Sequence, residues 1–243
     1  MSLFITGDIH SKVCDRFSFK QHPELRTLTD EDFMIIAGDF GAIWNWTGNS
    51  KEDKYYLDFV NSKPWKTIVV LGNHECYPIY EQMTHVTPSF LHSGSMYQCE
   101  YMGKIYENIY IIDTIAILDI EDNHILCING ADSHDRQWRI EGKSWWPQEA
   151  INIDKCLDFM ENHDKEHFDI IVTHDAPAAI NDWFSRDGHR YTSTCGQKYL
   201  EVLRKELDFD SWIHGHMHFD MDWPNTIDDR IYGIYEEILL LEE

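Results

Sequence analysis

The chain has 243 residues, and its 43 aspartates and glutamates outnumber its 20 lysines and arginines, giving a formal net charge of −23. This charge, with basic residues scattered rather than clustered, excludes long nucleic acid as a partner. No apolar run approaches the length of a membrane span, and the N-terminus lacks the basic and apolar regions of a signal peptide. We therefore expect a cytoplasmic protein without membrane contact, folded as one domain over residues 1–243.

Short apolar runs rich in β-branched residues predict strands that are buried on both faces. In chain order they cover residues 3–6, 33–38, 67–72, 108–112, 114–120, 124–130, 169–174 and 211–213. The polar turn 121–123 joins two of these strands and predicts a hairpin. Helical patterns cover residues 52–61, 147–162 and 196–207.

The order of these elements predicts an α/β protein. Early strand units alternate with helices and later strands form hairpins, which favours a pair of mixed sheets with helices outside. The segment IYGIYEEILLLEE, residues 231–243, fits a strand or a helix equally by its period. We leave both assignments open for that segment.

Five of the strands end in a cluster of polar residues. The clusters read GDIH, GDFG, GNHE, THDAP and GHMH in chain order. Ligands of open α/β sheets bind beyond the carboxyl ends of the strands, so we expect the five clusters to converge on one site. They supply carboxylate oxygens and imidazole nitrogens, which suit divalent transition metals at a hydrolytic site.

Spacing within the clusters suggests which side chains act together. Residues two apart on an extended segment project to the same side, so Asp8 and His10 can hold one ion, and His216 and His218 can each reach a metal. Taken alone, each cluster is more often structural than catalytic, because Asp commonly caps a turn and His is commonly a hydrogen-bonded residue at a strand end. We interpret His214 in that second way, as a strand or supporting residue.

The second cluster contributes Asp39, whose two carboxylate oxygens could bridge a pair of ions. The amide oxygen of Asn73 and the imidazole of His174 would then complete the coordination. Chance explains the whole set poorly, because each of the five clusters follows an apolar strand in the same direction.

In this order and with these gaps, the five motifs resemble the signature of the calcineurin-like metallophosphoesterase superfamily, from Asp8 to His218. The resemblance implies a four-layer α-β-β-α sandwich of two mixed sheets flanked by helices, with a centre of two divalent metals. The ligands that it implies fall into two groups sharing one carboxylate: Asp8, His10 and His218 for the first metal, Asn73, His174 and His216 for the second, and Asp39 between them.

The activity implied is hydrolysis of a small phosphomonoester or phosphodiester by attack of a metal-bridging hydroxide. His74 would act as the catalytic acid beside the leaving oxygen, oriented by Glu75 or a carbonyl. Two divalent ions with the carboxylates of Asp8 and Asp39 leave the site at about +2, so the acidity of the chain does not exclude a phosphate ester. Ligands without thiolate suit Mn, Fe, Zn, Ni or Co, of which we favour Mn.

The motifs depart from the protein serine/threonine phosphatase branch, in which G-D-x-x-D-R-G supplies an arginine to the phosphate. Asp39 is followed by FGAIWNW, which disfavours a protein substrate. The stretch NGADSHDRQWRIEGKSWWP resembles one in a bacterial and phage-like subgroup, with Asp135 and Arg139 at the matching positions. Arg139 fits a catalytic phosphate anchor and a salt bridge that fixes the loop equally well.

Substrate choice is the least determined property. Trp44, Trp46, Trp145 and Trp146 could stack a nucleobase, which would make the substrate a nucleotide, although core packing is the more frequent fate of tryptophan. Residues 78–107 are expected to form a cap or insertion over the site. The alternative function is a non-catalytic binding scaffold of the same fold. A metallo-β-lactamase type of hydrolase is disfavoured, because HGHMHFD lacks the H-x-H-x-D-H order.

Overall fold

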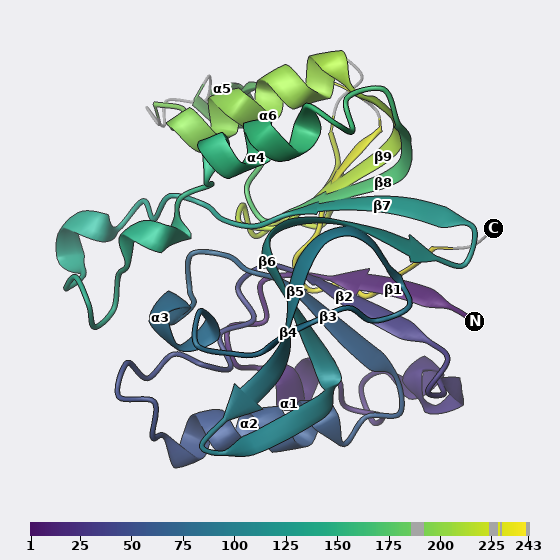
Figure 1. Ribbon diagram of the computed structural model, residues 1–243, viewed down its shortest axis with the longest axis vertical. Helices are drawn as coiled ribbons and strands as arrows, with labels where there is room; N and C mark the ends of the chain where they lie inside the picture. Colours follow the sequence, from purple (N-terminus) through teal and green to yellow (C-terminus); the bar gives the residue numbers. More distant parts are fainter. Residues whose placement is uncertain (186–191, 224–227, 229, 242–243) are drawn as a thin grey trace.

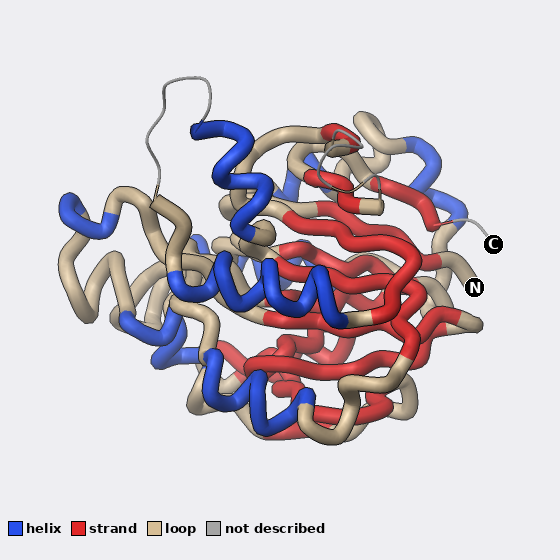
Figure 2. Tube along the Cα trace, turned by 90° about the horizontal axis from the view of Figure 1, so that it is seen from above, coloured by secondary structure: helices blue, strands red, loops and turns tan. Residues whose placement is uncertain are grey.

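The computed structural model describes residues 1–185, 192–223, 228 and 230–241. Within them, twelve strands form one mixed sheet that curls around an apolar interior, with helices on its outer faces (Figure 1 and Figure 2). The strands are β1 (Leu3–Thr6), β2 (Phe33–Ala37), β3 (Lys66–Val70), β4 (His85–Val86), β5 (Leu91–Tyr101), β6 (Lys104–Ile120), β7 (Asn123–Ile128), β8 (His167–Thr173), β9 (Asp208–His214), β10 (Met221–Asp222), β11 (Ile231–Gly233) and β12 (Leu239–Leu241). The α-helices are α1 (Val13–Arg16), α2 (Lys51–Asn61), α3 (Tyr77–Tyr80), α4 (Ile153–Met160), α5 (Ala178–Ser185) and α6 (Cys195–Glu206).

The strand order is β10-β11-β9-β8-β7-β6-β3-β2-β1-β12, with β5 also paired to β6 and β4 to β5. We expected two sheets, and the structure has one because β6 is a single strand where the sequence predicted two. Its first half pairs with β3 in parallel, and its second half pairs with β7 antiparallel through the predicted hairpin. As a result, β3 and β7 both end near the middle of β6.

Asn129, which directly follows β7, ties these strand ends together. Its side-chain oxygen accepts from the Leu71 amide at 2.9 Å, and its side-chain nitrogen donates to the Ile112 carbonyl at 2.7 Å. The backbone amide of Gly130 also donates to the Leu71 carbonyl at 2.8 Å. The loops after β1–β3 and those after β7–β9 therefore start from the same end of the sheet.

Three apolar clusters hold the layers together. One lies between the halves of the curled sheet and contains Ile35, Val70, Ile125 and Val172 among others. A second packs α1 and α2 against β1–β3, and a third packs α4, α5 and α6 against β7–β9. The helices accordingly occupy opposite outer faces in Figure 1. The helices and strands use their apolar side chains in this packing, so the polar loops at the strand ends are the segments available for binding and catalysis.

Most predicted elements are confirmed, and the helix expected at 147–162 is partly wrong. Pro147–Glu149 is a separate 3₁₀ turn, and α4 begins at Ile153, where the Asn152 side chain caps the Lys155 amide. The turn is separate because Glu149 points inward and accepts hydrogen bonds from the Ser133 amide and the Trp145 indole. The ambiguous C-terminal segment forms two short strands, β11 and β12.

Residues 78–107 contain most of α3, then β4, β5 and the start of β6. β5 pairs antiparallel with β6 and extends the sheet.

Among the described helices, none is long and apolar enough to cross a membrane.

Candidate metal centre

The seven expected ligands come from five loops that follow β1, β2, β3, β8 and β9. The structure brings together all of them: Asp8, His10, Asp39, Asn73, His174, His216 and His218. Four are buried, His216 is partly buried, and His10 and His218 expose 23% and 47% of their side chains. A solute can therefore reach one side of an otherwise enclosed group.

Asp39 lies between two groups of ligand atoms. Its Oδ2 is 3.6 Å from His10 Nε2, and its Oδ1 is 3.2 Å from His174 Nε2. On the first side, His10 Nε2 lies 3.0 Å from His218 Nε2. On the second side, His174 Nε2 lies 3.1 Å from Asn73 Oδ1. The two oxygens of one carboxylate thus face two separate sets of donors, which is the arrangement that a ligand shared by two ions requires.

Two buried polar atoms at this centre, Asp8 Oδ1 and His216 Nε2, have no hydrogen-bond partner within the described part of the chain. The ring nitrogens nearest Asp8 Oδ1 are His218 Nε2 at 3.4 Å and His10 Nε2 at 4.0 Å. A buried polar group without a partner costs about 1–3 kcal/mol. A cation among these atoms would satisfy them, so the residues present fit a metal.

Electrostatics also favour a cation here. Burial raises the pKa of Asp39, but the charge and hydrogen bond of His174 outweigh it and hold this carboxyl pKa well below its usual range. Burial lowers the pKa of His174, but Asp39 and Asp8 outweigh it and raise it. A cation bound beside Asp39 would take the place of the proton on the His174 imidazole. Burial lowers the pKa of His216, which stays neutral, the form that a ligating imidazole needs.

The backbone at the ligands is left-handed, which corrects the reasoning from extended spacing. Asp8 and His10 have φ of 47°, Asp39 has 47°, and His216 and His218 have 66° and 56°. Non-glycine residues rarely adopt positive φ, and such strain collects at functional sites. The side chains of a D-x-H or H-x-H pair thus converge through tight turns after the strands, and not through the alternation of an extended chain.

A glycine before four of the ligands allows these turns to pack closely. Gly38 has φ of 82°, and a Cβ there would lie 2.0 Å from His174 Nδ1. A Cβ on Gly72 would lie 2.3 Å from Asp39 Oδ1. Both positions therefore exclude any larger residue. The sequence motifs contain these glycines, but their role is visible only in the folded contacts.

His214 is placed as expected, outside the group of ligands. It is fully buried, its Nδ1 lies 2.8 Å from the Gly215 carbonyl, and its Nε2 accepts from the Trp223 indole at 2.8 Å. Both ring nitrogens are therefore occupied. Through these hydrogen bonds, His214 stabilises the end of β9, directly before the loop that carries His216.

The comparisons agree with this geometry. The family model for calcineurin-like phosphoesterases matches residues 1–220. The chain belongs to the calcineurin-like phosphoesterase family. The matched residues include all seven expected ligands, and the family implies metal-dependent hydrolysis of phosphoesters.

Relatives within the family are distant. Human metallophosphoesterase domain-containing protein 1 is 25% identical over 194 residues, covering 77% of this chain and 54% of the relative. A lariat debranching enzyme from Arabidopsis thaliana is 21% identical over 249 residues, covering 90% and 54%. The chain thus spans about half the length of the curated relatives it matches. Among solved structures, the phosphopantetheinyl hydrolase of Mycobacterium tuberculosis is similar with a TM-score of 0.47 and 12% identity, covering 96% of this chain and 89% of that one.

The loop after β7 brings Arg139 to the candidate metal centre. Its guanidinium donates to His74 Nε2 at 2.8 Å and to the Asn73 carbonyl at 3.2 Å, and it pairs with Asp135 at 2.6 Å. Arg139 is therefore bridged within its loop and also lies beside the expected ligands, a geometry that is compatible with both interpretations. The same loop carries Ser133, whose hydroxyl accepts from the Asn73 amide nitrogen at 3.1 Å and so turns the amide oxygen toward His174.

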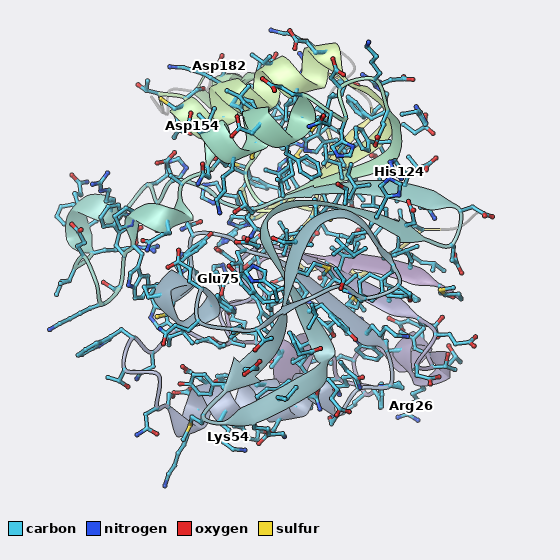
Figure 3. The ribbon with its side chains drawn as sticks, viewed as in Figure 1. Arg26, Lys54, Glu75, His124, Asp154 and Asp182 are labelled. Atoms are coloured by element: carbon cyan, nitrogen blue, oxygen red, sulfur yellow. The ribbon has the colours of Figure 1, made fainter. Side chains whose placement is uncertain are left out.

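The surroundings of His74 differ from the expectation. Burial lowers its pKa to about 4, with the Arg139 charge adding to the effect, so His74 is neutral and its Nε2 accepts from Arg139. A protonated His74 that donates to a leaving group is not the form that this geometry favours. Glu75 does not orient His74, because its oxygens accept from the Gly41 amide and the Tyr80 hydroxyl. Figure 3 labels Glu75 in the interior of the fold.

A cavity of about 190 Å³ opens beside these residues. Its lining consists of Asp39, Asn73, His74, His134, Asp135, Arg139, His216 and His218. His134 was not singled out from the sequence, and it stacks on His216 with ring centroids 5.1 Å apart. Its signal was its place beside Asp135 in a loop already connected with the site. Residues 78–107 contribute none of this described lining.

The tryptophans also divide differently than expected. Trp145 and Trp146 are buried at 7% and 4% exposure, so neither offers a face to a nucleobase. Trp44 stacks on His74 with centroids 5.4 Å apart, and Trp46 is exposed at 52%. Aromatic surface near the centre therefore comes from the loop after β2 and not from the Trp145–Trp146 pair.

Proposed function

We propose that this chain is a phosphoesterase that uses two divalent ions to hydrolyse a small phosphomonoester or phosphodiester. The observation that carries the proposal is Asp39, whose oxygens face His10 on one side and His174 on the other. The unpartnered atoms of Asp8 and His216 give it independent support. In the proposed assignment, Asp8, His10 and His218 hold one ion, and Asn73, His174 and His216 hold the other.

Divalent ions at such a centre lower the pKa of water and neutralise the charge of a phosphoryl group. The protein's own part is to fix the ligands and to orient the ester. Arg139 is suited to the second task, because its guanidinium lines the cavity beside the ligands and its planar set of donors matches phosphoryl oxygens. His74, held neutral by burial with its Nε2 accepting from Arg139, carries its remaining hydrogen on Nδ1, and we propose that it donates this hydrogen to an ester oxygen.

The proposal is tested with p-nitrophenyl phosphate and bis-p-nitrophenyl phosphate, using chelator-stripped protein and added Mn²⁺, Zn²⁺ or Mg²⁺. We expect turnover only after metal is restored, and fastest with Mn²⁺. The ratio of the two rates distinguishes monoesters from diesters. Failure to bind any metal, together with silence on both esters, would favour the binding scaffold.

Replacement of Arg139 tests its part in orienting the ester. Arg139→Ala should lower kcat/KM by about a hundredfold, since charge-assisted hydrogen bonds of this kind contribute roughly 1.5–3 kcal/mol. Arg139→Lys should restore only part of that loss, because lysine cannot donate to His74 and an ester oxygen in one plane. Steady-state kinetics on the faster ester measure both. If Arg139→Ala had the same kinetics as the wild type, the only remaining role of Arg139 would be the salt bridge within its loop.

We also propose a nucleotide as the natural ester. A second cavity of about 300 Å³ lies along the loop after β2, and Trp44, Trp46 and Lys143 are part of its lining. Trp44 connects the two cavities, because its ring stacks on His74. Exposed indole and a nearby cation suit a base and its phosphate. A nucleoside phosphate ester turned over no faster than p-nitrophenyl phosphate would contradict this extension.

A further inference from the structure

A second group of histidines and carboxylates lies at the other end of the sheet. Its members come from four places along the chain: His92 in β5, Asp119 near the end of β6, His124 at the start of β7, and Glu166 directly before β8. Glu166 directly precedes β8 and His174 directly follows it, so the two residues lie at opposite ends of this strand, eight residues apart. At about 3.3 Å per residue this separation is roughly 25 Å, so the group is distinct from the candidate metal centre. Figure 3 shows His124 well away from Glu75.

Asp119 connects the two imidazoles. Its Oδ2 lies 2.8 Å from His92 Nδ1, and its Oδ1 lies 2.7 Å from His124 Nδ1. One carboxylate therefore accepts from Nδ1 of both rings. Nε2 of His124 faces the Glu166 carboxylate, so an ion bound between them would take the place of the Nε2 hydrogen. A carboxylate behind a histidine is the usual support of a metal-ligating imidazole, because it fixes the tautomer and the ring orientation.

Glu166 supplies an oxygen on the Nε2 side. Its Oε2 lies 3.0 Å from His124 Nε2, and its Oε1 accepts from His163 Nδ1 at 2.8 Å. One donor atom each of His92, His124 and Glu166 lies within 4.8 Å of the others. The His124 ring is further held by Phe168, which stacks on it with an interplanar angle of 3°. Both ligand types and their supports are thus in place before an ion arrives.

We propose that His92, His124 and Glu166 form a surface site for one transition-metal ion of the zinc type. Two imidazoles and a carboxylate are ligands that such an ion accepts, with water free to complete the coordination. The side chains are 43%, 24% and 33% exposed, so an ion can enter from solvent. The ion would join β5, β7 and the start of β8, which makes it a structural clamp independent of phosphoester hydrolysis.

Zinc titration of the chelator-stripped full chain tests this site, with bound metal counted after equilibrium dialysis. We expect His92→Ala and Glu166→Gln each to bind one equivalent fewer than the wild type, or to bind it at least about tenfold more weakly. Glu166→Gln keeps the size of the side chain, so it reports on the site even where His92→Ala disturbs the strand. Hydrolysis of the p-nitrophenyl esters should be unchanged in both.

His85→Ala is the matched control. His85 is 59% exposed and lies 3.5 Å from the Asp113 carboxylate, so it resembles His92 in exposure and pairing but lies outside the group. It should bind as much zinc as the wild type. Equal zinc stoichiometry and affinity in the wild type, His92→Ala and Glu166→Gln would overturn the proposal and leave a hydrogen-bonded network only. A loss of zinc in His85→Ala equal to that in His92→Ala would also overturn it.

Discussion

Asp39→Asn is expected to lower kcat/KM for the chromogenic esters by about three orders of magnitude, equivalent to roughly 4 kcal/mol of transition-state stabilisation. The amide keeps the shape of the side chain and can still accept from the His74 backbone amide, which Asp39 Oδ1 binds at 2.8 Å. It removes the negative charge that faces both His10 and His174. Circular dichroism and the thermal midpoint should stay close to those of the wild type.

His214→Ala is the comparison for Asp39→Asn. This change leaves the Trp223 indole without its acceptor and should cost about 1–3 kcal/mol of stability. Activity should only weaken, because both nitrogens of His214 are used within the protein. Total loss of turnover in both variants, with both folded, would contradict the place of His214 outside the ligands.

Gly38→Ala should destabilise the protein by about 3 kcal/mol and abolish turnover, as the sum of positive-φ strain and overpacking. The added Cβ would overlap His174, which must move away from Asp39 to make room. Chemical denaturation and steady-state kinetics measure the two effects. We expect activity to stay lost even at temperatures where the variant is folded.

Gly103→Ala separates strain from overlap. Gly103 has φ of 74°, close to that of Gly38, but a Cβ there meets nothing within 4 Å. It should lose about 1 kcal/mol of stability and keep its activity. If Gly38→Ala lost no more stability and activity than Gly103→Ala, the close packing around His174 would not matter for function.

The ends of the strands were predictable because a buried strand is recognisable in the sequence as a continuous apolar run. A continuous apolar run followed by Gly-Asp, Gly-Asn or Thr-His marks both a central strand and the loop beyond it, and the structure puts Asp8, Asp39, Asn73 and His174 at such ends. Features that depend on pairing between distant parts of the chain were harder to predict. The unbroken β6 depends on which neighbours its two halves pair with, and a local pattern does not record that.

The details of the site depend on contacts between distant residues. His74 and Arg139 are 65 positions apart, and only their hydrogen bond shows that His74 accepts there and is neutral. Asp8 and His216 have a left-handed φ that local spacing does not reveal, and a Cβ on Gly215 of one loop would lie 2.6 Å from Asp8 Oδ2 of another. Trp46 and Trp146 carry the same side chain, and the fold exposes one and buries the other.

The most direct test of the account is the electron paramagnetic resonance spectrum of the stripped protein as Mn²⁺ is added. Two ions that share the Asp39 carboxylate are close enough to couple, so we predict a spin-coupled spectrum in the wild type that is lost in Asp39→Asn. An ion at the remote His92–His124–Glu166 site adds only an uncoupled component. A spectrum of isolated ions at every ratio of Mn²⁺ to wild-type protein would contradict a shared ligand and, with it, the two-metal centre.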